Sequence, residues 1–223
     1  MFSNRQSAGQ QLAKQLLHLR GEQPLVLALP RGGVPIGLEV AKALAAPLDV
    51  ILVRKIGVPW QPELAIGAIV DGPNPQRLLD EHLIAELGID RAYIRDECAR
   101  QLAEIERRRK LYFGEHPPIP LHGRTVIVVD DGIATGATMR TALRAVRNAG
   151  AAKIIVATPL APEDTLELLR AEADEVICLS SPTPFIAIGM HYADFTQVED
   201  AEVLALLNEA RRHEGRPDAS QSE

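Results

Sequence analysis

The chain has 223 residues, of which 46% are hydrophobic and 24% charged, values typical of a single globular domain. Its net charge of −6 argues against a general nucleic-acid coat protein. No apolar run approaches the roughly 18 residues that span a bilayer, and the first residues lack the apolar core of a signal peptide. Cys98 and Cys178 show no metal or redox spacing. These features predict a cytoplasmic protein with no membrane partner.

The first quarter of the chain alternates between helices and short apolar strands. A helix with apolar residues at helical spacing ends near Gly21, and an apolar strand is expected at 24–30. A second helix begins near Pro35 and leads to another apolar strand at 49–55. Strand, helix and strand over about thirty residues form a βαβ unit, which implies a parallel sheet.

The middle of the chain interrupts this alternation. Residues 57–64 contain two prolines and are expected to form a loop, followed by a short strand at 65–72. A long helix is predicted over about residues 90–112, and a proline-rich connector follows at 114–123. We therefore expect an insertion at about residues 72–123.

The second half returns to strands and helices. Apolar strands are predicted at 125–130, 153–159 and 175–180, with helices between them. This pattern predicts an α/β fold with a doubly wound, mainly parallel sheet in one domain over residues 1–212, followed by a disordered tail at 213–223. In such sheets ligands bind beyond the carboxyl ends of the strands, which here are residues 30–33, 54–55 and 130–138.

The strongest chemical signal is the sequence VIVVDDGIATGATM. Its apolar strand delivers Asp130 and Asp131 to the edge of the sheet, where they can accept hydrogen bonds from a ribose diol or hold Mg²⁺. Gly136 lets the following backbone approach a ligand closely, and the N–H groups and hydroxyls around Thr135 and Thr138 suit a phosphate. An N-capped helix with two acids at a strand end is the plain structural alternative.

This segment resembles the phosphoribosyl-diphosphate (PRPP) motif of type I phosphoribosyltransferases. The resemblance implies that Asp130 and Asp131 contact the ribose hydroxyls of PRPP. It also implies that the 5′-phosphate is held by the loop Ala134, Thr135, Gly136, Ala137 and Thr138. The longer members known as predicted phosphoribosyltransferases are similar to this chain, whose expected insertion is outside the minimal family core.

The sequence ALPRGG, at the end of the first strand, resembles the diphosphate-binding loop of the same family. By that resemblance, the N–H groups of Arg31, Gly32 and Gly33 and the Arg31 guanidinium face the leaving diphosphate. Family members often have a strained or cis peptide bond here, which the glycine pair would tolerate. A simple strand-to-helix turn is the alternative.

Arg54 and Lys55 close the second predicted strand and either remain solvated or stabilise the charge that develops on diphosphate. By resemblance, residues 57–64 match the flexible lid of the family. Ala134 stands where several purine-salvage members place an acidic base, so Glu63 on the lid becomes the candidate base, with a solvated glutamate as the alternative. The expected catalytic residues are therefore Lys55, Arg31 and Glu63.

Residues 184–195 resemble the hood of purine-salvage enzymes, in which an aromatic ring stacks on the base and an acid assists the metal. This hood would comprise about residues 181–198 and the N-terminal helix. Phe185 and Ile186 would then bind the acceptor, and Asp194 would join Asp130 and Asp131 at Mg²⁺. Ordinary hydrophobic contacts are the alternative for Phe185.

The run Glu106–Lys110 is interpreted as a charged helix surface, with nucleic-acid contact as the alternative. By resemblance, the chain is expected to be a pentosyltransferase of nucleotide metabolism that uses PRPP and Mg²⁺. Its small-molecule partners would be PRPP and an unidentified acceptor, a nitrogen nucleophile such as a nucleobase. The alternatives are a non-catalytic PRPP-sensing regulator and a generic sugar-phosphate binder. A homodimer stays open.

Overall fold

The computed structural model describes residues 1–71, 75–114 and 116–214. They fall into two compact units, the first comprising Met1–Val50 with the chain from Leu121 onward, and the second Ile51–Pro120. The expected insertion at 72–123 thus coincides with much of the second unit, which also includes the preceding residues from Ile51. Residues 215–223 of the predicted tail are outside the described residues, whereas His213 and Glu214 end a helix.

The first unit contains a parallel sheet of five strands in the order β2-β1-β6-β7-β8. The strands are β1 (Leu25–Ala28), β2 (Leu48–Val50), β6 (Thr125–Val129), β7 (Lys153–Leu160) and β8 (Glu175–Ser180). All of β1 is buried, and so is β6 after Thr125, as expected of central strands covered on both faces.

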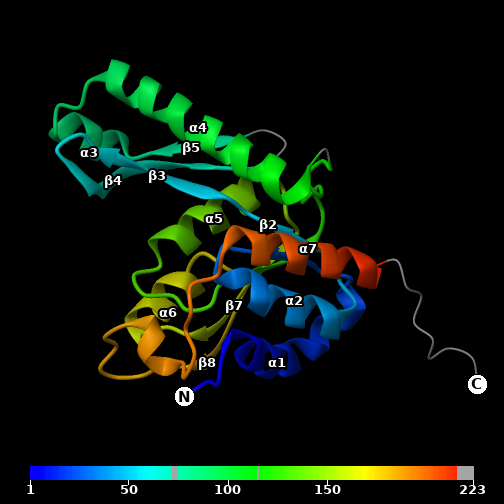
Figure 1. Cartoon of the computed structure of the whole chain (residues 1–223). Coiled ribbons are helices and arrows are strands. Elements are labelled where there is room, and N and C mark those ends of the chain that lie inside the picture. Colours follow the sequence, from blue (N-terminus) through cyan, green and yellow to red (C-terminus); the bar gives the residue numbers. More distant parts are fainter. Residues whose placement is uncertain (72–74, 115, 215–223) are drawn as a thin grey trace, which may run out of the picture. The chain divides into compact units, whose positions relative to one another are not determined.

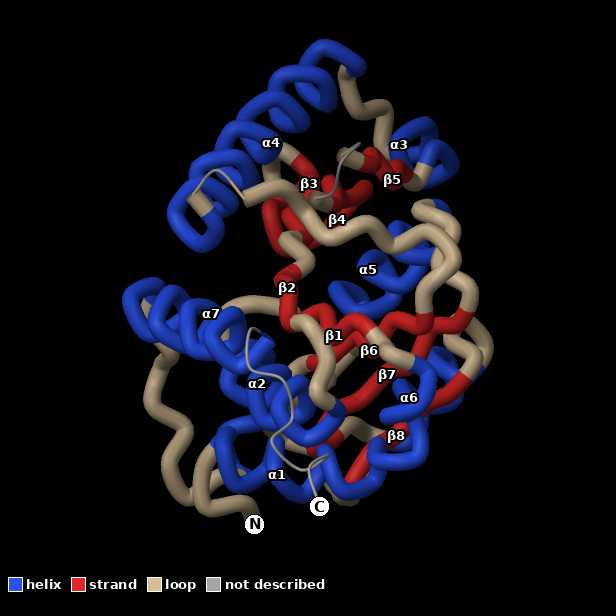
Figure 2. Tube along the Cα trace, turned by 90° about the vertical axis from the view of Figure 1, so that its right-hand side faces the viewer, coloured by secondary structure: helices blue, strands red, loops and turns tan. Residues whose placement is uncertain are grey.

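Helices cover both faces of this sheet, with α1 and α2 on one side and α5 and α6 on the other (Figure 2). The helices are α1 (Arg5–Leu16), α2 (Gly33–Leu44), α5 (Ala137–Asn148), α6 (Glu163–Arg170) and α7 (Asp200–Glu214), which packs on α2. Short 3₁₀ helices, η1 (Leu17–Glu22) and η2 (Ile188–His191), complete the unit. The predicted doubly wound, mainly parallel fold is confirmed.

The second unit corrects the prediction of a continuous strand at 49–55. The strand β2 ends at Val50, and β3 (Val53–Val58) starts an antiparallel sheet with β4 (Gln61–Val70) and β5 (Gln76–Leu79). Lys55 is exposed on β3 whereas Ile56 and Val58 are buried, so β3 cannot be a core strand covered on both faces. The loop predicted at 57–64 is likewise wrong, because most of these residues belong to β3 and β4.

The long helix predicted over about 90–112 is confirmed as α4 (Arg91–Phe113), and the shorter α3 (Glu81–Glu86) precedes it. Asp90 caps α4 by accepting a hydrogen bond from Ala92 N. The helix runs along the three-stranded sheet (Figure 1), and Tyr93 donates a hydrogen bond to the carbonyl of Gly57 on β3. Among the described residues, no helix combines the length and apolar surface that crossing a bilayer requires.

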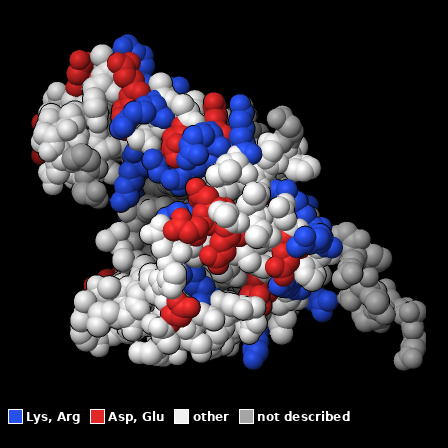
Figure 3. Space-filling view, in the orientation of Figure 1, with Lys and Arg blue, Asp and Glu red and all other residues white. Residues whose placement is uncertain are grey.

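The charged run on α4 forms ion pairs within the unit. Glu104 accepts hydrogen bonds from Arg107 and Arg108, each at 2.8 Å, and these contacts lower the pKa of Glu104 to about 2. Arg109 pairs with Asp71. Figure 3 shows Lys and Arg atoms beside Asp and Glu atoms in this region. The pairing supports the interpretation as a charged helix surface, because cations already paired with acids attract phosphates less strongly.

Candidate functional site

Two acidic side chains follow β6 directly, at the carboxyl end of the sheet. Asp131 N donates a hydrogen bond to Asp130 Oδ1 at 2.9 Å, which fixes the two residues relative to each other. Asp131 is 8% exposed, and Asp130 is half-buried. Burial, and then the neighbouring Asp131 charge, raise the pKa of Asp130 well above its ordinary value. The pair therefore forms a site that favours a proton, a hydrogen-bond donor or a cation.

The glycine loop at the end of β1 lies directly against this acid pair. A Cβ added at Gly32 would have all three carboxyl-group atoms of Asp131 within 2.8 Å, and one at Gly33 would lie 2.7 Å from Val129 O. Neighbouring parallel strands explain this contact, since β1 pairs with β6 and their carboxyl ends meet. The peptide bond between Pro30 and Arg31 is cis, as the resemblance implies.

The loop between β6 and α5 leaves polar backbone groups accessible. Gly136 has a φ of +76° and occupies the N-cap of α5, where it supplies no side-chain cap. Thr165 on α6 anchors the loop by donating to the carbonyl of Ala134 at 2.7 Å. Ala134, Thr135 and Ala137 are exposed. Because first-turn N–H groups have no acceptor within their helix, this loop can bind an anion such as phosphate.

Arg31, in the loop between β1 and α2, has a long ion-pair contact with an acidic side chain. Its Nη1 is 3.5 Å from Glu199 Oε2, and the Glu199 side chain is 67% exposed. The Arg31 side chain is 32% exposed. Its guanidinium is therefore accessible to a ligand, and its role at the diphosphate loop stays a prediction.

Three predicted site residues belong to the second unit. Arg54 donates a hydrogen bond to Gln101 on α4 at 2.9 Å, Lys55 is exposed on β3, and Glu63 is part of β4. The side chain of Glu63 is outside the described part of the structure. Since β3 belongs to the antiparallel sheet, Arg54 and Lys55 do not end a strand of the parallel sheet. This removes the reason for expecting them beside the diphosphate loop.

The segment predicted as a hood contacts the N-terminus of the chain. Phe2 N donates to His191 O at 2.8 Å, and Asp194 N donates to Ser3 O at 2.9 Å. Phe185 stacks on His191 with ring centres 5.9 Å apart, and Ile186 is 69% exposed. The two residues predicted to bind the acceptor therefore present apolar surface. The imidazole of His191 covers part of the Phe185 ring.

Asp194 has partners within its own loop. Its Oδ1 accepts hydrogen bonds from Thr196 N at 3.0 Å and from Thr196 Oγ1 at 2.7 Å. Across residues 1–71, 75–114 and 116–214, no group of three or more His, Cys, Asp or Glu side chains is arranged for a metal ion. The predicted triad of Asp130, Asp131 and Asp194 is therefore not assembled as one cluster.

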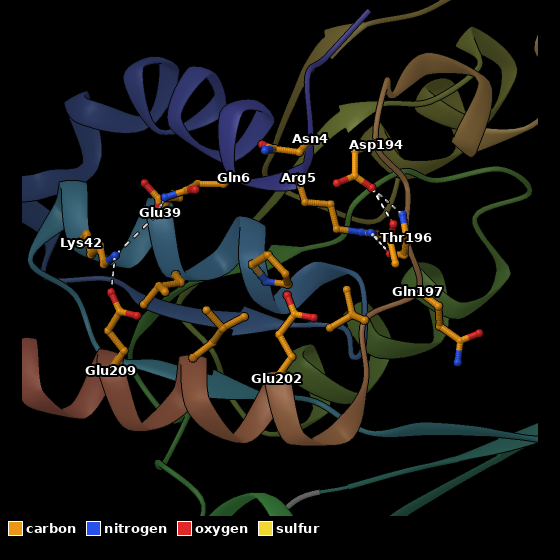
Figure 4. Close-up of a pocket in the computed structure, with 14 residues that line it drawn as sticks. Asn4, Arg5, Gln6, Glu39, Lys42, Asp194, Thr196, Gln197, Glu202 and Glu209 are labelled. Atoms are coloured by element: carbon orange, nitrogen blue, oxygen red, sulfur yellow. Dashed lines mark hydrogen bonds and ion pairs between the residues drawn. The ribbon is translucent and has the colours of Figure 1, made fainter.

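Two residues that the sequence did not indicate contact the acid pair. Arg5 Nε donates to Asp131 Oδ2 at 2.6 Å, and the Tyr192 hydroxyl donates to the Asp131 carbonyl at 2.6 Å. Arg5 also lines a cavity of about 440 Å³ between α1, α2, α7 and residues 194–198 (Figure 4). Both residues lie in segments assigned to the predicted hood, but their contacts with Asp131 join residues 126 and 61 positions apart in the sequence, which no local pattern indicates.

Comparison with known proteins agrees with this arrangement. A family model described as "Phosphoribosyl transferase domain" matches residues 3–194. A Mycobacterium tuberculosis protein with the name "Putative phosphoribosyl transferase" is 46% identical over 212 residues, which are 95% of this chain and 47% of that protein. The chain thus spans about half the length of the curated relatives it matches.

A solved structure of similar size provides a second comparison. The crystal structure of the protein TT1426 from Thermus thermophilus is 42% identical and superimposes with a TM-score of 0.82, covering 94% of this chain and 98% of that one. With the family match over most of the chain and the juxtaposed loops at the ends of β1 and β6, the conclusion is that this chain belongs to the phosphoribosyltransferase family.

Proposed function

We propose that this protein transfers a phosphoribosyl group from PRPP to a nitrogen nucleophile such as a nucleobase. In this reaction the bond between ribose C1 and the diphosphate oxygen breaks, and the nucleophile attacks C1 from the opposite face. The observation that carries the proposal is the contact between the Gly32–Gly33 loop and the acid pair at Asp130 and Asp131. A ligand bound there would contact both the carboxylates that can accept hydrogen bonds from a ribose diol and the loop that can bind a diphosphate.

Each end of PRPP has a proposed partner. Asp130 and Asp131 would accept hydrogen bonds from the ribose hydroxyls, and the N–H groups at the start of α5 would hold the 5′-phosphate. Arg31, with the backbone of Gly32 and Gly33, would bind the diphosphate. Holding both ends of the substrate favours displacement at C1, because it restricts the substrate to a reactive geometry.

A role for Arg54 and Lys55 in stabilising the charge on the departing diphosphate remains a proposal that rests on their positive charge, since they do not end a strand of the parallel sheet. Two other roles are proposals from the family resemblance. Glu63 would accept the proton of the nucleophile, and Phe185 and Ile186 would contact the acceptor.

Carboxylate oxygens at the acid pair fit Mg²⁺, which proteins usually bind through one or two carboxylates together with substrate phosphates. Bound Mg²⁺ would supply positive charge against the diphosphate. Asp194 also remains a proposed Mg²⁺ ligand, but it would first have to give up its present hydrogen bonds with Thr196.

The test is diphosphate release from PRPP in the presence of Mg²⁺, with and without an extract of small metabolites. We expect release that depends on the extract, and fractionation would then identify the acceptor. The double variant Asp130→Asn with Asp131→Asn is the matched control and should lose PRPP binding while keeping its circular dichroism spectrum. If the protein binds PRPP but releases no diphosphate with any acceptor tested, the alternative of a non-catalytic PRPP-sensing regulator is supported. If it does not bind PRPP, the proposal is contradicted.

A further inference from the structure

Arg5, the first residue of α1, makes three polar or stacking contacts with distant parts of the first unit. Its Nε donates to Asp131 Oδ2 at 2.6 Å, and its Nη1 donates to the carbonyl of Thr196 at 2.7 Å. The central guanidinium carbon is 3.9 Å from the centre of the Phe195 ring. The side chain is 11% exposed. Arg5 therefore connects the acid pair with the hood segment.

The chain before Arg5 is itself held in place. Asn4 caps α1 by accepting a hydrogen bond from Ser7 N at 2.8 Å. Ala193 N donates to Phe2 O at 2.8 Å, beside the other backbone contacts of residues 2–3 with 191–194. Figure 4 shows the Arg5 side chain extending from the start of α1 toward Thr196. The guanidinium thus has a defined position and direction.

Asp131 is enclosed by partners, unlike Asp130. Arg5 contacts one of its carboxylate oxygens, Gly32 packs against the carboxyl group, and the Tyr192 hydroxyl holds its carbonyl. The Asp130 side chain accepts from Asp131 N and is half-buried. The two acids are therefore not equivalent, since Arg5 forms a direct hydrogen bond with Asp131 and acts on Asp130 only through its charge.

We propose that Arg5 is a positioning residue that neutralises and orients Asp131, so that the acid pair presents a defined geometry beside the diphosphate loop. The inference rests on the proposed function. PRPP carries several negative charges, and two uncompensated carboxylates at its binding site would repel it. Arg5 adds one positive charge beside the pair and so lowers this repulsion. Because Arg5 also binds Thr196, the geometry of the acid pair depends on the hood segment.

Arg5 could instead only stabilise the packing of α1 on the sheet. A double-mutant cycle distinguishes this structural role from an effect on PRPP binding through Asp131. The variants are Arg5→Gln, Asp131→Asn and their combination, with Arg5→Lys as the conservative change. Lys keeps the charge but lacks the planar fork that reaches Asp131 and Thr196 while stacking on Phe195. Arg170→Gln is the control, because Arg170 forms an exposed ion pair with Glu163 on α6.

The measurements are the dissociation constant of PRPP with Mg²⁺ by calorimetry and the midpoint of thermal unfolding. We expect Arg5→Gln to weaken PRPP binding about tenfold or more, with a smaller loss for Arg5→Lys and no change for Arg170→Gln. In the Asp131→Asn background, Arg5→Gln should add less than about a twofold loss, because the partner through which Arg5 acts is already altered.

Two results would overturn the inference. A lower unfolding midpoint with unchanged PRPP affinity in Arg5→Gln would leave Arg5 a purely structural role. Equal losses of affinity in both backgrounds would show that Arg5 does not act through Asp131. If the unmodified protein does not bind PRPP, both the proposed function and this inference fail. If it binds PRPP and the Arg5 variants bind equally well, only this inference fails.

Discussion

Substitution of Gly32 by alanine tests the contact on which the proposed site depends. Gly32 has a φ of −60° and a ψ of −31°, which alanine adopts without strain, so the effect of the change comes from the added methyl group alone. That Cβ would lie within 2.8 Å of all three carboxyl-group atoms of Asp131. Real Cβ contacts essentially never fall below 3.0 Å, so either the loop or the carboxylate must move.

The carboxylate cannot move freely, because Arg5 holds it at 2.6 Å and only 8% of Asp131 is exposed. Overpacking of this kind typically lowers the free energy of unfolding by about 1–3 kcal/mol. We expect Gly32→Ala to lose stability in this range in urea unfolding. PRPP affinity should fall by about tenfold or more in calorimetry, because the proposed diphosphate loop and the acid pair are displaced together.

Gly21→Ala is the matched control, since a Cβ at Gly21 meets nothing within 4 Å. Its free energy of unfolding should stay within about 0.5 kcal/mol of the unmodified protein. The reasoning is refuted if Gly32→Ala keeps both the stability and the PRPP affinity of the unmodified protein. Gly32 would then not lie against Asp131 in solution.

Three further substitutions test the loop, the acid pair and the second unit. Gly136→Ala places a side chain at a φ of +76° and should cost about 1–2 kcal/mol in urea unfolding while weakening PRPP binding. Gly123→Ala, at a φ of +72° with open space around it, should show the backbone cost with unchanged affinity, and equal affinities in the two variants would contradict the phosphate-loop assignment. Because the pKa of Asp130 is raised in the folded state, folding favours its protonated form, and this contribution to stability is lost as pH rises through the folded pKa. The Asp130→Asn variant should therefore have a higher free energy of unfolding than the unmodified protein near neutral pH. This difference should shrink as the pH falls toward about 4, and a difference that does not depend on pH would argue against the raised pKa. Lys55→Ala should reduce turnover more than PRPP affinity if Lys55 acts on departing diphosphate, whereas equal losses in kinetic and calorimetric measurements would make it a simple anchor.

The ends of β1 and β6 could be predicted from the sequence because their signals are local. A short apolar run followed by Arg31-Gly32-Gly33, and another followed by Asp130-Asp131 and a Thr-Gly loop, identify buried strands that end in polar turns. Neighbouring parallel strands then place both ends at one edge of the sheet, as the structure confirms. Fold class and family followed from these same segments.

The second unit could not be delimited in this way. The run from Asp49 to Lys55 has a composition that suits one strand, and only the exposure of Lys55 beside buried Ile56 distinguishes β3 from a core strand. Periodicity over so few residues does not distinguish one long strand from two short ones in different sheets. The hairpin of β3 and β4 also depends on packing against α4, through contacts such as Tyr93 with Gly57.

By itself, the sequence determined which residues end the buried strands and which chemical groups they offer, because both depend on neighbouring residues in the chain. The tertiary structure alone decided which groups neutralise them. Arg5 is 126 residues from Asp131 in the sequence, and no local pattern connects an arginine at a helix start with a carboxylate that follows a distant strand. Their ion pair exists because the N-terminal segment pairs with residues 191–194 and packing of the first unit brings both side chains to one place.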